Sequence, residues 1–134
     1  MYKIVDVPPK MEKFYGKGKM LHPEVDMVEK VVKEIPKGKI ATISQIADRM
    51  AKMVGVDVSC PMRTGNAIKQ IAEDKENVPY WRVIRNDKGI VKSSKYEQSA
   101  SRIEDEGFQL VYKGDSISIS FRDEDLVDFQ LEKT

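Results

Sequence analysis

The stretch that decides the fold runs from Thr42 to Ala72 and reads TISQIADRMAKMVGVDVSCPMRTGNAIKQIA. Thr42 followed three residues later by Gln45 forms a capping box, which predicts the start of a helix. Gly55 predicts its end, because glycine readily adopts the left-handed conformation that closes helices. Cys60-Pro61 predicts the start of a second helix, since proline is favoured in a first helical turn. The sequence therefore predicts two helices joined by a turn.

The spacing of apolar residues gives each helix an inward face. The first helix is expected to bury Ile46, Ala47, Met50 and Met53, and the second to bury Ala67, Ile68, Ile71 and Ala72. The polar residues left for solvent or a ligand on the second helix are Arg63, Thr64, Asn66 and Lys69. Residues 56–59 are expected to form the turn between the helices.

Two short helices joined by a turn are a general DNA-binding device, in which the second helix presents its N-terminal turn to the nucleic acid. That turn contains Gly65, which costs roughly 1 kcal/mol of helix stability relative to alanine. A glycine there suits the close approach of another backbone. Two helices also pack together in many small domains that bind no DNA, so the pattern alone leaves both interpretations open.

The chain before this core predicts a strand, a basic segment and a helix. Residues 3–7 are expected to form a short edge strand that stops at Pro8-Pro9. Residues 10–19 contain four lysines, two aromatic residues and two glycines. Such a segment either follows the phosphates of a nucleic acid or is a solvated loop whose aromatic side chains pack on the core. A helix is then predicted to open at His22-Pro23-Glu24 and to end at Pro36-Lys37-Gly38.

Composition favours one soluble domain. The 134 residues are 40% hydrophobic and 34% charged, which is typical of a globular protein large enough to bury a core. No apolar run approaches the ~20 residues of a membrane span, and the N-terminus does not resemble a signal peptide. The single Cys60 cannot form an internal disulfide, so we expect a cytoplasmic protein. With one cysteine and one histidine, no zinc site of the usual ligand types is expected.

Charge is distributed unevenly along the chain. Residues 1–95 contain 19 basic and 12 acidic side chains, a balance of +7, and residues 96–134 contain 4 and 10, a balance of −6. A basic body with an acidic tail favours a polyanionic partner. Uneven solvation of a neutral protein is the alternative.

The C-terminal part predicts a helix, a hairpin and a tail. Residues 96–106 are expected to be helical, and residues 108–112 and 116–121 alternate with the period of β-strands around a turn at Lys113-Gly114-Asp115. Residues 123–131 predict a short acidic helix or docking segment, which covers a sheet edge, holds a partner or shields the basic body. The predicted fold is mainly α with a small β component: a winged-helix-like helix-turn-helix domain plus a C-terminal β-hairpin.

Five segments carry a family resemblance, in matching order and at similar spacing: Ile35–Thr42, Gln45–Ala47, Pro79–Ile84, Gly89 and Glu106-Gly107. Over residues 23–107 the chain resembles the C-terminal domain of methylated-DNA–protein cysteine methyltransferases. That family has Pro-Cys-His-Arg-Val at its active site, where this chain reads Pro-Tyr-Trp-Arg-Val. In the related alkyltransferase-like proteins the cysteine is also replaced and no alkyl group is transferred.

The resemblance implies a protein without the transfer activity. That reaction needs a thiolate and a neighbouring base to form it. Tyr80 stands in the cysteine position and Trp81 in the histidine position, and neither a phenol with a pKa near 10 nor an indole does these jobs. Cys60 lies twenty positions before Tyr80 and is expected to be a small buried residue. The glutamate behind the family's active site is present as Glu106, for which we expect a structural role.

The resemblance also implies how the chain meets DNA. The family binds the minor groove through its helix-turn-helix and turns an alkylated guanine out into a pocket. A tyrosine that presses on the target phosphate is replaced here by Ile43. The arginine that fills the gap left by the base aligns with Met62, so either Arg63 acts in a shifted register or Met62 acts as an apolar wedge. Tyr80 and Trp81 either stack on a flipped base or Tyr80 fills the former pocket.

These observations lead to a leading hypothesis and two alternatives. The leading hypothesis is a non-catalytic DNA-binding protein that recognises alkylated guanine and marks it for repair. The alternatives are a general winged-helix DNA binder or regulator without lesion preference, and a scaffold that keeps the fold for a protein partner. Candidate DNA-binding residues are Thr42, Ser44, Met62, Arg63, Thr64, Gly65, Asn66 and Lys69, and the candidate base pocket consists of Pro79, Tyr80, Trp81 and Arg82.

The expected partners are double-stranded DNA and a repair protein, without a membrane, a metal or a cofactor, and the expected state is a monomer. The expected organisation has three parts. Residues 1–22 form an N-terminal strand and basic arm, residues 23–107 form the DNA-binding domain, and residues 108–134 form a hairpin and acidic tail packed on the same domain.

Overall fold

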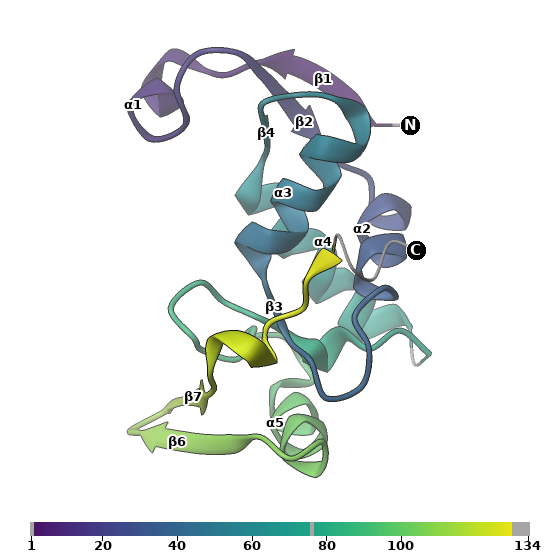
Figure 1. The fold of residues 1–134 in the computed structure, drawn as a ribbon, viewed down its shortest axis with the longest axis vertical. Coiled ribbons are helices and arrows are strands. Elements are labelled where there is room, and N and C mark those ends of the chain that lie inside the picture. The colour runs from purple at the N-terminus through teal and green to yellow at the C-terminus, as the bar shows by residue number, and fades with distance from the viewer. Residues whose placement is uncertain (1, 76, 130–134) are drawn as a thin grey trace.

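The computed structural model describes residues 2–75 and 77–129 of the chain. The elements in chain order are β1 (Lys3–Asp6), η1 (Pro9–Met11), α1 (Glu12–Tyr15), β2 (Lys19–His22), α2 (Val25–Val32), β3 (Ala41–Thr42), α3 (Ile43–Val54), β4 (Val58–Ser59), α4 (Pro61–Asp74), η2 (Tyr80–Arg82), β5 (Val83–Ile84), α5 (Tyr96–Asp105), β6 (Gln109–Lys113), β7 (Ser116–Ser120) and η3 (Asp123–Asp125). Helices α2, α3 and α4 form the middle of the molecule, with β1, β2 and α1 at one end and α5, β6 and β7 at the other (Figure 1). The mainly α fold with a small β component is confirmed. Over the described ranges, none of the helices combines the length and apolar character needed to cross a bilayer.

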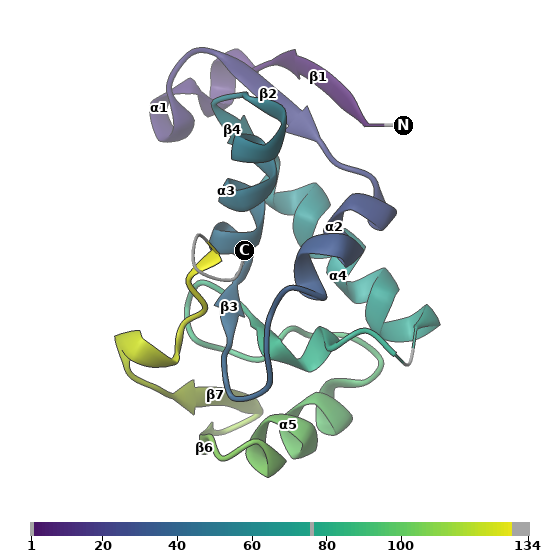
Figure 2. The ribbon, with the colours of Figure 1, turned by 45° about the vertical axis from the view of Figure 1, so that its right-hand side comes forward.

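The main core lies between α2, α3 and α4. These three helices lie together in the middle of the ribbon in Figure 2. The side chains of this core come from the apolar helix faces that the sequence predicts. Those that are fully buried include Val28, Val31, Ile46, Met50, Ile68 and Ile71. Each such side chain contributes about 1.5–3 kcal/mol relative to leaving it in water. One predicted core residue is wrong, because Met53 is 45% exposed and Ala51 is buried in its place. Ala51 lies one helical turn after Ala47, so both alanines are on the buried face of α3. Met53 lies off this face and is exposed to solvent.

Both helices of the helix-turn-helix start, and the first one ends, where the sequence predicts. The Thr42 side chain and Gln45 form the capping box of α3, and Gly55 ends the helix with a φ of 76°. Cys60 is the N-cap of α4 and Pro61 is its first residue. The segment between the helices is more than a turn, because β4 within it pairs in parallel with β2.

The N-terminal segment forms a sheet on the outside of this turn. The predicted edge strand is confirmed as β1, which pairs antiparallel with β2, and the sheet order is β1-β2-β4. The predicted helix start, with Pro23 as the first helical residue, is wrong by two residues. His22 is the last residue of β2, Pro23 precedes the N-cap Glu24, and α2 begins at Val25. The sheet keeps the chain extended up to His22, because Cys60 N donates to the carbonyl of Leu21 at 2.9 Å.

The C-terminal part packs on the opposite end of the helices. Strand β3 pairs in parallel with β5, and the predicted hairpin is confirmed as β6 and β7. A second core joins these elements to α5 and consists of Ile40, Ile84, Ile90, Ala100, Ile103, Phe108 and Ile119. The tail covers a strand edge, as one of the predicted roles requires: Ile40 N donates to Asp125 O at 2.9 Å and Val127 N donates to Ile40 O at 2.8 Å. Leu131, which belongs to the predicted tail, lies outside the described residues.

Candidate nucleic-acid interface

Two candidate DNA-binding residues, Thr42 and Ser44, lie at the start of α3, and they differ in how far their side chains are free to meet a ligand. Thr42 Oγ1 accepts from Gln45 N at 3.1 Å, and Thr42 N donates to Gln45 Oε1 at 3.0 Å, so the threonine hydroxyl oxygen is already part of the helix cap. Ser44 is exposed, and its backbone N–H donates to Asn86 Oδ1 at 3.0 Å. Of these two candidate residues, Ser44 is the one whose side chain faces solvent at the helix start.

The start of α4 presents a mixed apolar and polar surface. Met62 is 71% exposed, and Arg63, Asn66 and Lys69 are also exposed. The expectation that Thr64 remains for solvent or a ligand is wrong, because Thr64 is fully buried. Its hydroxyl donates to Cys60 O at 2.8 Å. Threonine in a helix can bond back to the carbonyl four residues earlier, and this bond turns the side chain into the protein.

Gly65 lies on α4 where the helix passes Ile43. A Cβ built at Gly65 would meet Ile43 Cδ1 at 3.7 Å, an ordinary van der Waals distance. Packing within the described protein therefore does not require glycine at this position. The N-cap Cys60 makes no side-chain cap hydrogen bond, so the amides of the first turn of α4 have no side-chain acceptor from the cap. Such amides, at the positive end of the helix dipole, suit an anionic phosphate.

His22 lies where the positive charges of Arg63, on α4, and Lys3, on β1, act on its side chain. Partial burial lowers its pKa, and the charges of Arg63 and Lys3 lower it further. His22 is therefore neutral at pH 7, and the basic groups at this place are the lysine of β1 and the arginine of α4.

The segment aligned with the family's active site folds as a short 3-10 turn between the core and β5. Pro79 has φ −76° and ψ 62°, and Tyr80 N donates to Val78 O at 2.7 Å, which is an inverse γ-turn geometry. Tyr80 is 4% exposed and belongs to the main core, whereas Pro79 and Trp81 are partly exposed. The phenol of Tyr80 thus occupies a packed position rather than an open one.

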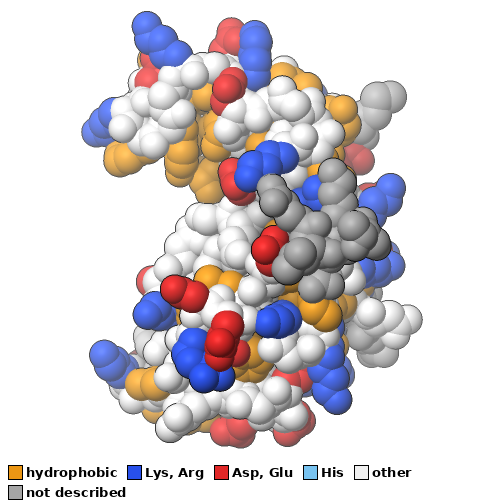
Figure 3. Space-filling view, viewed as in Figure 1, with side chains coloured by type: hydrophobic (Ala, Val, Ile, Leu, Met, Phe, Trp, Pro, Cys, Tyr) orange, Lys and Arg blue, Asp and Glu red, His pale blue; other side chains and the backbone are white. Residues whose placement is uncertain are grey.

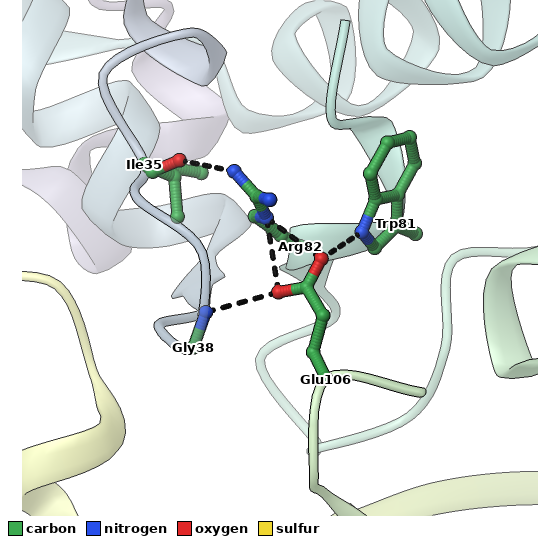
Figure 4. A network of polar contacts seen from close by, with 5 residues as sticks. All are labelled: Ile35, Gly38, Trp81, Arg82 and Glu106. Atoms are coloured by element: carbon green, nitrogen blue, oxygen red, sulfur yellow. Dashed lines mark hydrogen bonds and ion pairs between the residues drawn. The ribbon is translucent and has the colours of Figure 1, made fainter. Parts of the chain in front are cut away.

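Glu106 organises this segment from the end of α5 (Figure 4). Its Oε2 accepts from Trp81 Nε1 at 2.6 Å, and both carboxylate oxygens accept from Arg82 Nε at 3.0 and 3.1 Å. Gly38 N donates to Oε1 at 3.0 Å, and Arg82 also donates to Ile35 O at 2.8 Å. The network ties the start of β5 to the end of α5 and to the turn after α2, and the structural role expected for Glu106 is confirmed.

The surroundings of Glu106 keep it ionised. Burial acts to raise its pKa, but hydrogen bonds from Trp81, Gly38 and Arg82, together with the Arg82 charge, lower it overall. In this network Trp81 is a hydrogen-bond donor only, because an indole has no basic nitrogen. The carboxylate therefore acts as an anchor for the segment.

Tyr80 and Trp81 are bordered by cations from α5 and its start. The two rings meet edge to face, with centroids 5.2 Å apart and an interplanar angle of 85°. Lys95 Nζ lies 5.6 Å from the Tyr80 centroid, and Arg102 Cζ lies 4.5 Å from the Trp81 centroid. A cleft of about 430 Å³ is lined by Tyr80, Lys95, Gln98, Ser101 and Arg102. Lys95 and Arg102 were not among the sequence candidates, although their spacing of seven residues at a predicted helix indicates a shared face.

Cys60 is separated from this segment. It is 6% exposed and packs with Val7 and Met20 in a small core of its own. The expectation of a small buried residue at a helix start is confirmed. Over the described ranges, no group of three or more histidine, cysteine, aspartate or glutamate side chains is arranged to hold a metal ion.

Comparison with known protein families gives a match to the 6-O-methylguanine DNA methyltransferase, DNA binding domain, over residues 25–108. The chain belongs to this family. The predicted resemblance is thereby confirmed, and the matched region contains α2, α3, α4, the Tyr80–Arg82 turn and α5.

Two crystal structures resemble this family member. One is S. pombe Atl1 in complex with damaged DNA containing O6-carboxymethylguanine, with a TM-score of 0.63 and 24% sequence identity, covering 78% of this chain and 94% of that chain. The other is S. pombe ATL in complex with DNA, with a TM-score of 0.60 and 25% identity over the same shares of the two chains. A search of curated proteins gives no match.

Proposed function

We propose that this chain is a non-catalytic DNA-binding protein that recognises alkylated guanine and marks it for repair. The observation that carries the proposal is the pairing of an alkyltransferase family fold with Tyr80 and Trp81 at the nucleophile and base positions. The two solved structures with similar folds contain DNA, and in one of them the DNA carries an O6-alkylated guanine.

The DNA would be held by the starts of α3 and α4. Exposed Ser44, Arg63, Asn66 and Lys69 supply donors for phosphates and base edges. Met62, with 71% of its surface exposed, has the size and polarity of a wedge between base steps. Met62 leaves most of its surface in water in the free protein, whereas insertion into DNA would bury it.

Transfer of an alkyl group would fail for chemical reasons. The reaction needs a thiolate next to a base. Tyr80 is a buried phenol, Trp81 donates its indole N–H to Glu106, and Cys60 is buried in a separate core. A bound lesion would therefore persist in the complex, and its removal would fall to a repair partner.

The cleft beside Tyr80 would receive the flipped base. Lys95 and Arg102 line it, and a guanidinium or ammonium close to aromatic faces favours an electron-rich purine. The burial of Tyr80 also supports a second candidate function, a duplex binder without lesion preference, because a ring that fills the former pocket leaves less room for the base.

One titration separates the candidates. Matched duplexes with and without O6-methylguanine are titrated at two salt concentrations, and Arg63→Ala is tested beside the wild type. The proposal expects tighter binding to the lesion and a loss of affinity with salt. Equal affinities for both duplexes would support the second candidate, the duplex binder without lesion preference. A wild type that binds neither duplex would support the remaining hypothesis, a scaffold that keeps the fold for a protein partner.

We further propose that residues 23–107 act as the DNA-binding domain of a cytoplasmic monomer. The N-terminal arm packs on residues 23–107 because β2 pairs with β4. The C-terminal tail packs on them because Asp125 O accepts a hydrogen bond from Ile40 N and Val127 N donates one to Ile40 O.

A further inference from the structure

Helix α1 carries an exposed aromatic and basic element that precedes the family match at residues 25–108. Phe14 is 70% exposed and Tyr15 is 40% exposed, and their ring centroids are 6.3 Å apart. Lys13 Nζ lies 5.0 Å from the Phe14 centroid. Clustered apolar side chains on a soluble protein mark an interaction site more often than isolated ones do. The exposed rings of α1 and the adjacent lysine are therefore a candidate interaction site.

The position of α1 is fixed relative to α4. The segment that carries α1 lies between β1 and β2, and β2 pairs with β4, which leads directly into α4. Cys60 N donates to Leu21 O at 2.9 Å, and Val7, Met20 and Cys60 form the small core beneath the sheet. A ligand held at the start of α4 would therefore meet α1 at a defined place.

Tyr15 joins α1 to the proposed DNA-binding surface. It lines a cleft of about 370 Å³ together with Ser44 at the start of α3, Pro61 at the start of α4 and Asn86. The space-filling view shows the molecule hollowed beneath α1, with hydrophobic side chains along the upper margin of the hollow (Figure 3). The aromatic side chains of α1 thus continue the surface formed by the two helix starts.

The charge around α1 indicates the chemistry of its partner. Lys10, Lys13 and Lys17 are exposed, and no ion pair to another described residue neutralises them. Lys19, by contrast, pairs with Asp6 at 2.5 Å. Three exposed ammonium groups that pair with no described carboxylate lie beside two exposed rings. This combination suits a nucleic acid, whose phosphates supply the negative charge and whose sugars and bases supply flat surfaces.

We propose that α1 and the loop after it form a second DNA contact, which holds the duplex that flanks the segment bound by α4. The proposal rests on the proposed function, because it extends the same bound duplex. The lysines contact phosphates and the rings contact the sugars beside them, so the contact adds affinity for intact and alkylated DNA alike. It lengthens the footprint beyond that of the domain that matches the family.

The test compares two double variants of equal charge change. Lys13→Gln/Lys17→Gln removes ammonium groups next to α1, and Lys52→Gln/Lys113→Gln removes two exposed lysines at the end of α3 and in the hairpin. Each protein is titrated against a duplex of about one helical turn, ~10 base pairs, and against one of about three turns, both at several salt concentrations. Phe14→Ala is tested in parallel, and circular dichroism checks that each variant is folded.

On the longer duplex, the slope of log Kd against log salt should fall by about 1.8 for the Lys13/Lys17 variant, because each phosphate contact contributes about 0.9. The Lys52/Lys113 variant should match the wild type, and all proteins should bind the short duplex alike. Phe14→Ala should weaken binding to the longer duplex severalfold without changing the slope.

Equal slopes for the two double variants on the longer duplex, with a wild type that binds DNA, would overturn the α1 contact and leave the proposed function intact. A wild type that binds neither duplex would overturn both. A loss of affinity that is as large on the short duplex as on the long one would place these lysines at the α4 site and would also contradict the proposal.

Discussion

Replacing Glu106 with glutamine should destabilise the protein by about 3 kcal/mol. The Glu106 side chain is 7% exposed, and its carboxylate lies 3.0 Å from Arg82 Nε, whose side chain is 15% exposed. Trp81 and Gly38 donate to the same carboxylate. Glutamine keeps the size and one acceptor oxygen, but it turns an amide NH₂ toward donors and leaves a buried guanidinium without its counter-charge.

The magnitude follows from the contacts of Arg82. Removing one partner of a buried ion pair costs about 3–5 kcal/mol. Arg82 keeps its hydrogen bond to Ile35 O, so the lower end of that range applies. Against a total stability of about 5–15 kcal/mol, the loss is large.

Urea unfolding followed by tryptophan fluorescence measures the effect, since Trp81 is the sole tryptophan and lies in the network. The midpoint should fall by about 1–3 M, given a typical urea dependence of 1–3 kcal/mol per molar. Glu104→Gln, an exposed position on α5, is the matched control and should stay within about 0.5 kcal/mol of the wild type.

The pH dependence gives a second readout of the same contact. The pKa of Glu106 is lower in the folded protein than its ordinary value, because its hydrogen bonds and the Arg82 charge outweigh the effect of burial. Its contribution to stability is therefore present above the unfolded pKa and is lost as the pH falls through the folded pKa. The gap between wild type and Glu106→Gln should narrow below about pH 4. A variant as stable as Glu104→Gln, or a gap that is constant with pH, would refute this account of the network.

Three further predictions concern the site. Arg63→Ala should weaken duplex binding for intact and alkylated DNA alike and lower the salt slope by about 1, as measured by fluorescence anisotropy. Met62→Ala should reduce the preference for alkylated over intact duplex severalfold and leave the salt slope unchanged, and an equal loss on both duplexes would argue against a wedge. Tyr80→Cys should gain no alkyl transfer, because Trp81 cannot serve as the base that forms the thiolate; a labelled methyl group on the variant would show otherwise.

Local sequence signals predicted the helix boundaries at the centre of the fold. The Thr42 capping box, Gly55 and the Cys60-Pro61 start all appear as predicted, because each depends on backbone geometry within one turn. The hairpin between β6 and β7 was predictable for the same reason, since alternation and a glycine-containing turn are adjacent in sequence.

Features that depend on distant contacts were not predictable in this way. The pairing of β4 with β2 joins segments almost forty residues apart, and two-residue strands leave no periodic signal. Thr64 was expected at the surface because of its polarity, but its hydroxyl bonds to the Cys60 carbonyl within the helix and lets the side chain be buried. Met53 has the spacing of a core residue, and only the packing around α3 shows that it lies outside.

In the candidate site, too, some features were predictable from the sequence and others required the structure. Membership of the alkyltransferase family and the substitution of Tyr80 and Trp81 are visible in sequence, and the family match confirms the first. The bonds from Trp81 and Arg82 to Glu106 required the structure, because a tryptophan in a histidine position does not indicate by itself where its N–H points. The placement of Lys95 beside Tyr80 likewise depends on how α5 packs.

The most direct test of the central claim is the intact mass of the protein after incubation with a duplex that contains O6-methylguanine, under conditions where anisotropy shows the complex to be formed. We expect an unmodified polypeptide bound more tightly to the methylated duplex than to the intact one. A methyl adduct on the chain, on Cys60 or on any other residue, would contradict it.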